Sequence, residues 1–213
     1  MIDFKSLFLN EDLNGIDFPK SLSFFLDPGV GPWLHPLLLA RGVVEGPVVL
    51  GKVDSRAYLE GQVFVDEGAS IEPFSYIKGP CFIGKGSEVR HAAYIRGSVY
   101  LGVKCVVGHT TEVKNSVFLN GAKAGHFAYV GDSVLGERVN LGAGVKLANL
   151  KLRQDKISFF DPFLEKRRTS EFKKWGAWVG DDSQIGCNAV LSPGSVLKPR
   201  TLVMPNQHFH QKG

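Results

Sequence analysis

The stretch YLEGQVFVDEGASIEPFSYIKGPCFIGKGSEVRHAAYIRG, residues 58–97, carries a strict sixfold repeat. A period of six matches neither the 3.6-residue period of an amphipathic helix nor the two-residue period of a strand. Short fixed periods of this kind predict a parallel β-helix. The aliphatic residues of the repeat continue outward without a miss, as Val53, Leu59, Val65, Ile71, Ile77, Ile83, Val89, Ile95, Leu101, Val107 and Val113.

A second, threefold longer period lies on top of the first. The motif Tyr-Leu/Ile-x-Gly begins at Tyr58, Tyr76 and Tyr94. Three hexads therefore form one coil of three short strands, and stacked coils lie about 4.8 Å apart. After Val113 the series takes a five-residue step to Phe118, and it then continues to the end of the repeat. We predict an all-β fold, a parallel β-helix of about seven coils.

The repeat divides the chain into a cap, a β-helix and a tail. Residues 1–47 lack the repeat, and we expect them to cover the open end of the solenoid, because an uncovered end exposes strand edges and core. A segment that binds a partner or touches a membrane is the alternative. Residues 48–206 form the predicted β-helix, and residues 207–213 form a flexible tail.

Residues 148–177 interrupt the β-helix with a basic and aromatic sequence. Insertions of this length inside a compact domain are usually functional. This one is either a lid that brings cations and rings to an anionic ligand, or a solvated loop that packs on its neighbour. Its aromatic residues are Phe159, Phe160, Phe163, Phe172 and Trp175.

The composition limits the class of protein. The 213 residues suffice for one domain with a core, and 44% hydrophobic and 22% charged residues are ordinary globular values. No apolar run is long enough to predict a membrane span. Of the three cysteines, Cys81 and Cys105 occupy small inward positions, which indicates reduced thiols in a cytoplasmic protein. The net charge of +4 suits small anionic substrates and does not argue for nucleic acid.

Residues that depart from the repeat gather between Arg96 and Asn149, and they include the runs Ala124-Gly125-His126 and Gly142-Ala143-Gly144. Together with the hexapeptide repeat, this pattern resembles the left-handed parallel β-helix acyltransferases. Within that family it resembles the acetyltransferase domain of the bacterial bifunctional enzyme UDP-N-acetylglucosamine pyrophosphorylase/glucosamine-1-phosphate N-acetyltransferase, without its uridylyltransferase domain.

The resemblance implies an activity and a set of site residues. The reaction is acetyl transfer from acetyl-CoA, as co-substrate, to the amine of glucosamine-1-phosphate, a step in UDP-N-acetylglucosamine biosynthesis for the cell envelope. No metal is implied. The family forms homotrimers with sites between subunits. Carried over to this sequence, the catalytic residues are His126, Asn149, Glu112 and Ala143, the substrate-binding residues are Arg96, Lys114, Tyr129 and Asn140, and the residues that line the donor site are Ala143, Cys187 and Met204.

Each implied role agrees with the chemistry of its residue type. Arg96 and Lys114 on a rigid sheet can clamp a phosphate. A histidine such as His126 is a natural general base for an ammonium that must lose a proton before it attacks a thioester. Glu112 would orient that imidazole. The backbone N–H of Ala143 would stabilise the negative charge of the tetrahedral intermediate.

Three alternatives stay open. One is a metal-dependent β-helix hydratase, because His91, His109 and His126 occupy equivalent places on three successive coils. Another is a non-catalytic sugar-phosphate-binding subunit, or a scaffold for a separate uridylyltransferase. The third is an N- or O-acyltransferase for another amino sugar, with a nucleotide sugar as the acceptor.

Overall fold

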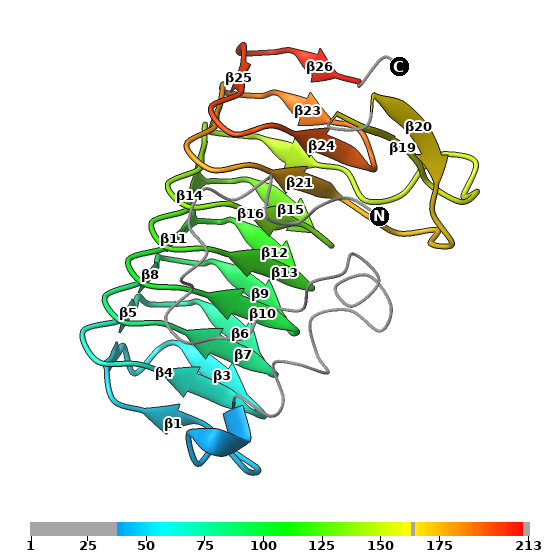
Figure 1. Ribbon diagram of the computed structural model, residues 1–213. Coiled ribbons are helices and arrows are strands. Elements are labelled where there is room, and N and C mark those ends of the chain that lie inside the picture. Colours follow the sequence, from blue (N-terminus) through cyan, green and yellow to red (C-terminus); the bar gives the residue numbers. More distant parts are fainter. Residues whose placement is uncertain (1–37, 163–164, 211–213) are drawn as a thin grey trace.

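The computed structural model describes residues 38–162 and 165–210. Their strands form a triangular prism of three parallel sheets, whose strands follow one another in turn around each coil (Figure 1). The predicted left-handed parallel β-helix is therefore confirmed. Each sheet contains eight strands, one more than the predicted seven or so coils. No helix in the described part of the chain is long and apolar enough to cross a membrane.

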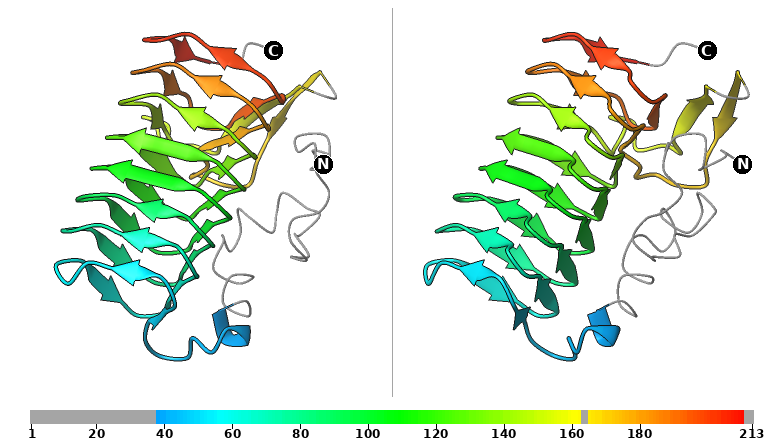
Figure 2. Two further views of the ribbon diagram at one scale, coloured as in Figure 1. Left: turned by 90° about the vertical axis from the view of Figure 1, so that its left-hand side faces the viewer. Right: turned by 60° about the vertical axis from the view of Figure 1, so that its left-hand side comes forward.

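We name the three faces of the prism sheets A, B and C, and Figure 2 shows them from two sides. Sheet A consists of β1 (Val48–Val49), β4 (Val63–Val65), β7 (Cys81–Ile83), β10 (Val99–Leu101), β13 (Ser116–Phe118), β16 (Val134–Leu135), β21 (Ala177–Val179) and β24 (Ser195–Leu197). Sheet B consists of β2 (Lys52–Val53), β5 (Ser70–Ile71), β8 (Glu88–Val89), β11 (Val106–His109), β14 (Lys123–His126), β17 (Asn140–Leu141), β22 (Gln184–Ile185) and β25 (Leu202–Val203). Sheet C consists of β3 (Tyr58–Glu60), β6 (Tyr76–Lys78), β9 (Tyr94–Arg96), β12 (Glu112–Lys114), β15 (Tyr129–Gly131), β18 (Lys146–Leu147), β23 (Val190–Leu191) and β26 (His208–Phe209).

The sixfold aliphatic residues fill the interior of the prism. Ile77 pairs in register with Ile95 of the next coil, and both side chains are fully buried in the core. Where the sequence takes its five-residue steps, the coil is one residue shorter, because Leu101 pairs with Phe118. The stacking continues through these short coils, so the same inward column is preserved from one end of the repeat to the other.

The insertion folds back onto the outer face of sheet A. It contains an antiparallel hairpin of β19 (Ser158–Asp161) and β20 (Lys166–Thr169). Phe159 packs edge-on against Trp175 at 4.6 Å between ring centroids, and Trp175 packs against Trp178 of β21 at 5.8 Å. All three rings are buried. Phe159 and Trp175, two of the rings expected in a lid, are therefore packing residues of this face, whereas Phe163 lies outside the described residues.

The two ends of the β-helix differ in how far the structure describes them. The first strand begins at Val48, where the sequence predicted the β-helix to begin. Of the predicted cap, residues 1–37 lie outside the described part, and Arg41 of the remainder lies over the ring of Phe64 at 5.5 Å. At the other end, β26 pairs with β23 and so extends the last coil into the segment assigned to the tail. Residues 211–213 lie outside the described part.

Candidate functional site

Three of the four residues expected to bind the sugar phosphate lie on sheet C, and the fourth, Asn140, begins β17 of sheet B. Arg96 ends β9, and Lys114 ends β12 one coil further along. Tyr129 begins β15 in register with Glu112 of β12. Asn149 follows β18 by two residues. Parallel stacking therefore brings residues from four consecutive coils onto one face, which we call the acceptor face.

Arg96 is held by the carboxylate of Glu112. The guanidinium NH1 lies 2.6 Å from Glu112 Oε1, and the two side chains are 44% and 35% exposed. This hydrogen bond raises the pKa of Arg96 above its usual value. A pair this exposed contributes little to stability, so it serves mainly to orient the guanidinium. Among the described residues, Glu112 has no hydrogen bond to His126, and its role in orienting that imidazole stays a prediction.

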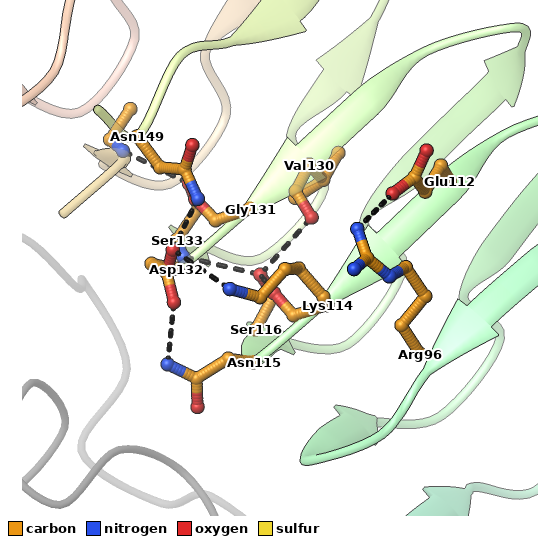
Figure 3. Close-up of polar contacts among 11 residues, drawn as sticks. Arg96, Glu112, Lys114, Asn115, Ser116, Val130, Gly131, Asp132, Ser133 and Asn149 are labelled. Atoms are coloured by element: carbon orange, nitrogen blue, oxygen red, sulfur yellow. Dashed lines mark hydrogen bonds and ion pairs between the residues drawn. The ribbon is translucent and has the colours of Figure 1, made fainter. Parts of the chain in front are cut away.

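A buried aspartate organises the rest of the acceptor face. The Asp132 carboxylate, 7% exposed as a residue, lies at the turn after β15. Its Oδ2 lies 3.4 Å from Lys114 Nζ and accepts a hydrogen bond from Asn149 Nδ2, while its Oδ1 accepts one of 2.8 Å from Asn115 Nδ2. Figure 3 shows these groups facing the carboxylate. The sequence analysis assigned no role to Asp132 or to Asn115.

Tyr129 remains a neutral phenol in this setting. Burial raises its pKa above the usual value, and the negative charges of Asp132 and Glu112 act in the same direction. Its hydroxyl and the Asn149 amide both lie over Gly131, where an added Cβ would be 2.6 Å from the hydroxyl oxygen and 2.8 Å from Asn149 Nδ2. Glycine at this position therefore makes room for the two side chains to meet.

The residues expected to line the donor site lie at the corner between sheets B and C, close to the expected base His126 and to Asn140, which was expected to bind the substrate. His126, Asn140, Ala143 and Cys187 line a groove of about 790 Å³ along sheet B. Met204 is exposed and follows β25, in the coil after that of Cys187. Ala143, Cys187 and Met204 thus occupy the same corner on successive coils. Arg90, Lys104 and Lys123 add positive charge to the groove.

The corner before His126 is fixed by close contact between two coils. Gly108 of β11 lies directly below Gly125 of β14, and a Cβ at Gly108 would be 1.6 Å from the Gly125 carbonyl oxygen. In the next coil, Gly144 donates a hydrogen bond of 3.0 Å to the His126 carbonyl. No hydrogen bond within the described residues uses the Ala143 N–H, so this donor is available to a ligand in the groove.

The histidines predicted to line up on one corner do so only in part. His91 and His109 stack at 5.1 Å between ring centroids, with their Nδ1 atoms 3.0 Å apart. His126 pairs with His109 through the backbone. Nowhere in the described ranges do three His, Cys, Asp or Glu side chains gather closely enough to share a metal ion. Of the three histidines behind the metal-dependent alternative, only His91 and His109 have side chains in contact.

The fold is that of the hexapeptide-repeat left-handed β-helix proteins, and the sequence is similar to bifunctional proteins of the GlmU kind. Residues 77–164 match the family model for the C-terminal domain of GMPPB. The chain is 42% identical over 158 residues to the bifunctional protein GlmU of Methanococcus maripaludis. The aligned residues cover 74% of this chain and 38% of that protein.

The chain is also similar to two other proteins. A bifunctional sugar-1-phosphate nucleotidylyltransferase/acetyltransferase of Sulfurisphaera tokodaii is 39% identical over 87 residues, which cover 41% of this chain and 21% of that protein. A hexapeptide transferase family protein from Anaplasma phagocytophilum has a solved structure with a TM-score of 0.33 and 16% identity, over 76% of this chain and 78% of that one. The chain thus spans only a fifth to two fifths of these two curated relatives, 21% and 38%.

Proposed function

We propose that this protein is an acetyl-CoA-dependent N-acetyltransferase that acts on glucosamine-1-phosphate or a related hexosamine-1-phosphate. One observation carries the proposal. Fixed cations, Arg96 and Lys114, lie with Tyr129 and Asn149 on the acceptor face, and a groove with a histidine and a free backbone N–H lies on the adjoining sheet. The curated relatives, which are bifunctional proteins, include a sugar-1-phosphate nucleotidylyltransferase/acetyltransferase.

The proposed reaction is direct transfer between the two bound substrates. Arg96 and Lys114 bind the sugar phosphate. His126 removes a proton from the substrate ammonium, and the amine then attacks the thioester carbonyl carbon. The Ala143 N–H donates to the oxygen of the tetrahedral intermediate. The carbon–sulfur bond then breaks, the departing CoA thiolate takes the proton from the His126 imidazolium, and the nitrogen of the new amide releases its extra proton to water.

The groove on sheet B suits the proposed donor. Arg90, Lys104 and Lys123 can neutralise the phosphates of acetyl-CoA, while Cys187 lines the groove beside its acyl arm and Met204 is exposed one coil further on. Because the acceptor face and the groove lie on different sheets of the prism, we propose a homotrimer in which these faces of neighbouring protomers combine. A separate nucleotidyltransferase would consume the product.

A nucleotide sugar is the second candidate for the acceptor. Lys78 of β6 pairs in register with Arg96 and extends the row of cations by one coil. Beside it, the rings of Tyr58, Tyr76 and Tyr94 stack at 5.4 Å between centroids. Three cations in a row suit a diphosphate better than a single phosphate. Lys78→Ala should weaken the binding of a nucleotide sugar and leave the binding of a sugar monophosphate unchanged.

The test is thiol release from acetyl-CoA with glucosamine-1-phosphate, compared between wild type and His126→Ala. We expect turnover in the wild type and a loss of about 100-fold or more in the variant, because general base catalysis contributes that much. Sugar-phosphate binding, measured by calorimetry, should persist. His109→Ala is the matched control, since His109 is exposed at the same corner one coil below.

Each other outcome has a defined meaning. Binding of the sugar phosphate without turnover would contradict acetyl transfer and favour a non-catalytic binding subunit. The absence of both binding and turnover would overturn the acceptor face as a sugar-phosphate site. Equal losses in His126→Ala and His109→Ala would show that His126 is not the base.

A further inference from the structure

Asp132 is the most constrained charged group of the acceptor face. Its φ of 49° lies in the left-handed region, so the backbone turns sharply there and the carboxylate projects back over sheet C. Its N–H donates to the Lys114 carbonyl at 3.0 Å, and its carbonyl accepts from Gly176 at 2.9 Å. The position of the carboxylate is therefore set by the backbone of two neighbouring segments.

The carboxylate determines which way the Asn149 amide points. An ionised carboxylate only accepts hydrogen bonds, so the group that Asn149 presents to Asp132 must be its NH₂. This amide lies over Gly131 together with the Tyr129 hydroxyl, and its NH₂ is directed at the buried carboxylate. The carbonyl oxygen Oδ1 of Asn149 is left as the acceptor that a ligand can use.

The backbone of Asn149 is held as firmly as its side chain. Its carbonyl accepts a hydrogen bond of 2.9 Å from the N–H of Trp175, whose ring is fully buried at the end of the insertion. The next residue, Gly176, is the one that donates to Asp132. The end of the insertion therefore donates hydrogen bonds to the backbone carbonyls of both Asn149 and Asp132, and these bonds fix the backbone position of Asn149.

We propose that Asp132 is a positioning residue for acetyl transfer, which holds Asn149 with its carbonyl oxygen directed at the substrate amine. This inference rests on the proposed function. An N–H of the attacking amine that points at a fixed acceptor orients the nitrogen lone pair toward the thioester. The orientation matters in the reaction step more than in binding, because a misdirected amine can still bind through its phosphate.

The test is Asp132→Asn, which keeps the size of the side chain and suits a positive φ. Its amide oxygen is a weaker acceptor than the carboxylate, and its new NH₂ must face the NH₂ of Asn149 or that of Asn115, which both donate to Asp132. We expect kcat to fall about tenfold or more, the effect of one lost hydrogen bond to a charged group. The KM for the sugar phosphate should stay unchanged or fall, because Lys114 loses its counter-charge.

A matched control and a double variant isolate the effect. Asp182→Asn changes another corner aspartate with a positive φ, paired with Arg138 on the far side of sheet B, and should leave both constants unchanged. In an Asn149→Ala background, Asp132→Asn should not lower kcat any further, because the side chain that Asp132 positions is absent. Wild-type kcat in Asp132→Asn would overturn the proposal. So would an equal loss in both backgrounds, or a joint loss of kcat, sugar-phosphate affinity and thermal stability.

If the wild type shows no turnover, the proposed function is wrong. A second measurement then still tests whether Asp132 positions Asn149. The side-chain NH₂ signals of Asn149, identified in ¹⁵N spectra by their loss in Asn149→Ala, report the orientation directly. We expect slow hydrogen exchange of this NH₂ in the wild type and fast exchange in Asp132→Asn. Fast exchange in the wild type, or no change in the variant, would refute the positioning role.

Discussion

At the scale of single residues, side chains with the same charge or the same chemistry differ because their neighbours differ. Arg96 and Lys114 are both cations of sheet C, but Arg96 is half-exposed with Glu112, whereas Lys114 lies against a buried carboxylate. The three thiols differ in the same way. Burial raises the pKa of Cys105 to about 12 and that of Cys81 further, while Cys187 is exposed in the groove.

This difference predicts the reactivity of the cysteines. Because the thiolate is the reactive form, a thiol reagent should modify Cys187 alone in the folded protein and all three cysteines after denaturation. Saturating CoA should slow the modification of Cys187, since both occupy the groove. Cys187→Ser is the control and should abolish the reaction of the native protein. A rate that does not change with CoA would place the donor elsewhere.

At the scale of the elements, the corner that presents His126 contains two glycines, of which only one is closely packed. Gly108 meets the Gly125 carbonyl of the next coil, and this backbone cannot retreat without breaking the pairing of β11 with β14. Gly125 itself has no atom within 4 Å of an added Cβ. Neither glycine has a positive φ, so the requirement at Gly108 comes from close approach.

The pair makes an internally controlled prediction. Gly108→Ala should destabilise the protein by roughly 3 kcal/mol, the upper range for overpacking, and should reduce acetyl transfer because His126 is displaced. Gly125→Ala, one coil above at the same corner, should leave the unfolding midpoint nearly unchanged. Denaturant unfolding and the thiol-release assay measure both effects. Equal stability of the two variants would contradict the close contact.

At the scale of the whole molecule, the prism separates the two halves of the proposed site. The acceptor face lies on sheet C, and the groove lies on sheet B, around a corner of the same chain. The insertion covers part of the third face, sheet A, where its buried Trp175 packs against Trp178 of β21. This arrangement leaves sheets B and C for contacts between protomers in the proposed trimer.

A site shared between protomers predicts complementation. His126→Ala and Lys114→Ala should each be nearly inactive alone, and co-expressed mixtures of the two chains should recover part of the activity, since some interfaces then combine an intact His126 with an intact Lys114. His126→Ala mixed with Asn140→Ala, two lesions of the same groove, should recover none. Mixed oligomers without any recovery would place the whole site within one chain.

The sequence by itself determined the repeat architecture, because a solenoid converts a sixfold pattern directly into inward and outward positions. It also located the short coils through the step from Val113 to Phe118. The pairing of Glu112 with Arg96 and the contacts of the Asp132 carboxylate came only from the tertiary structure. Side-chain partners on adjacent coils depend on which rotamers the packing permits, and a one-dimensional pattern carries no information about that choice. For the same reason, only the structure showed that Phe159 and Trp175 pack on sheet A, and that Asp132, Lys114 and Asn149 meet at a single carboxylate.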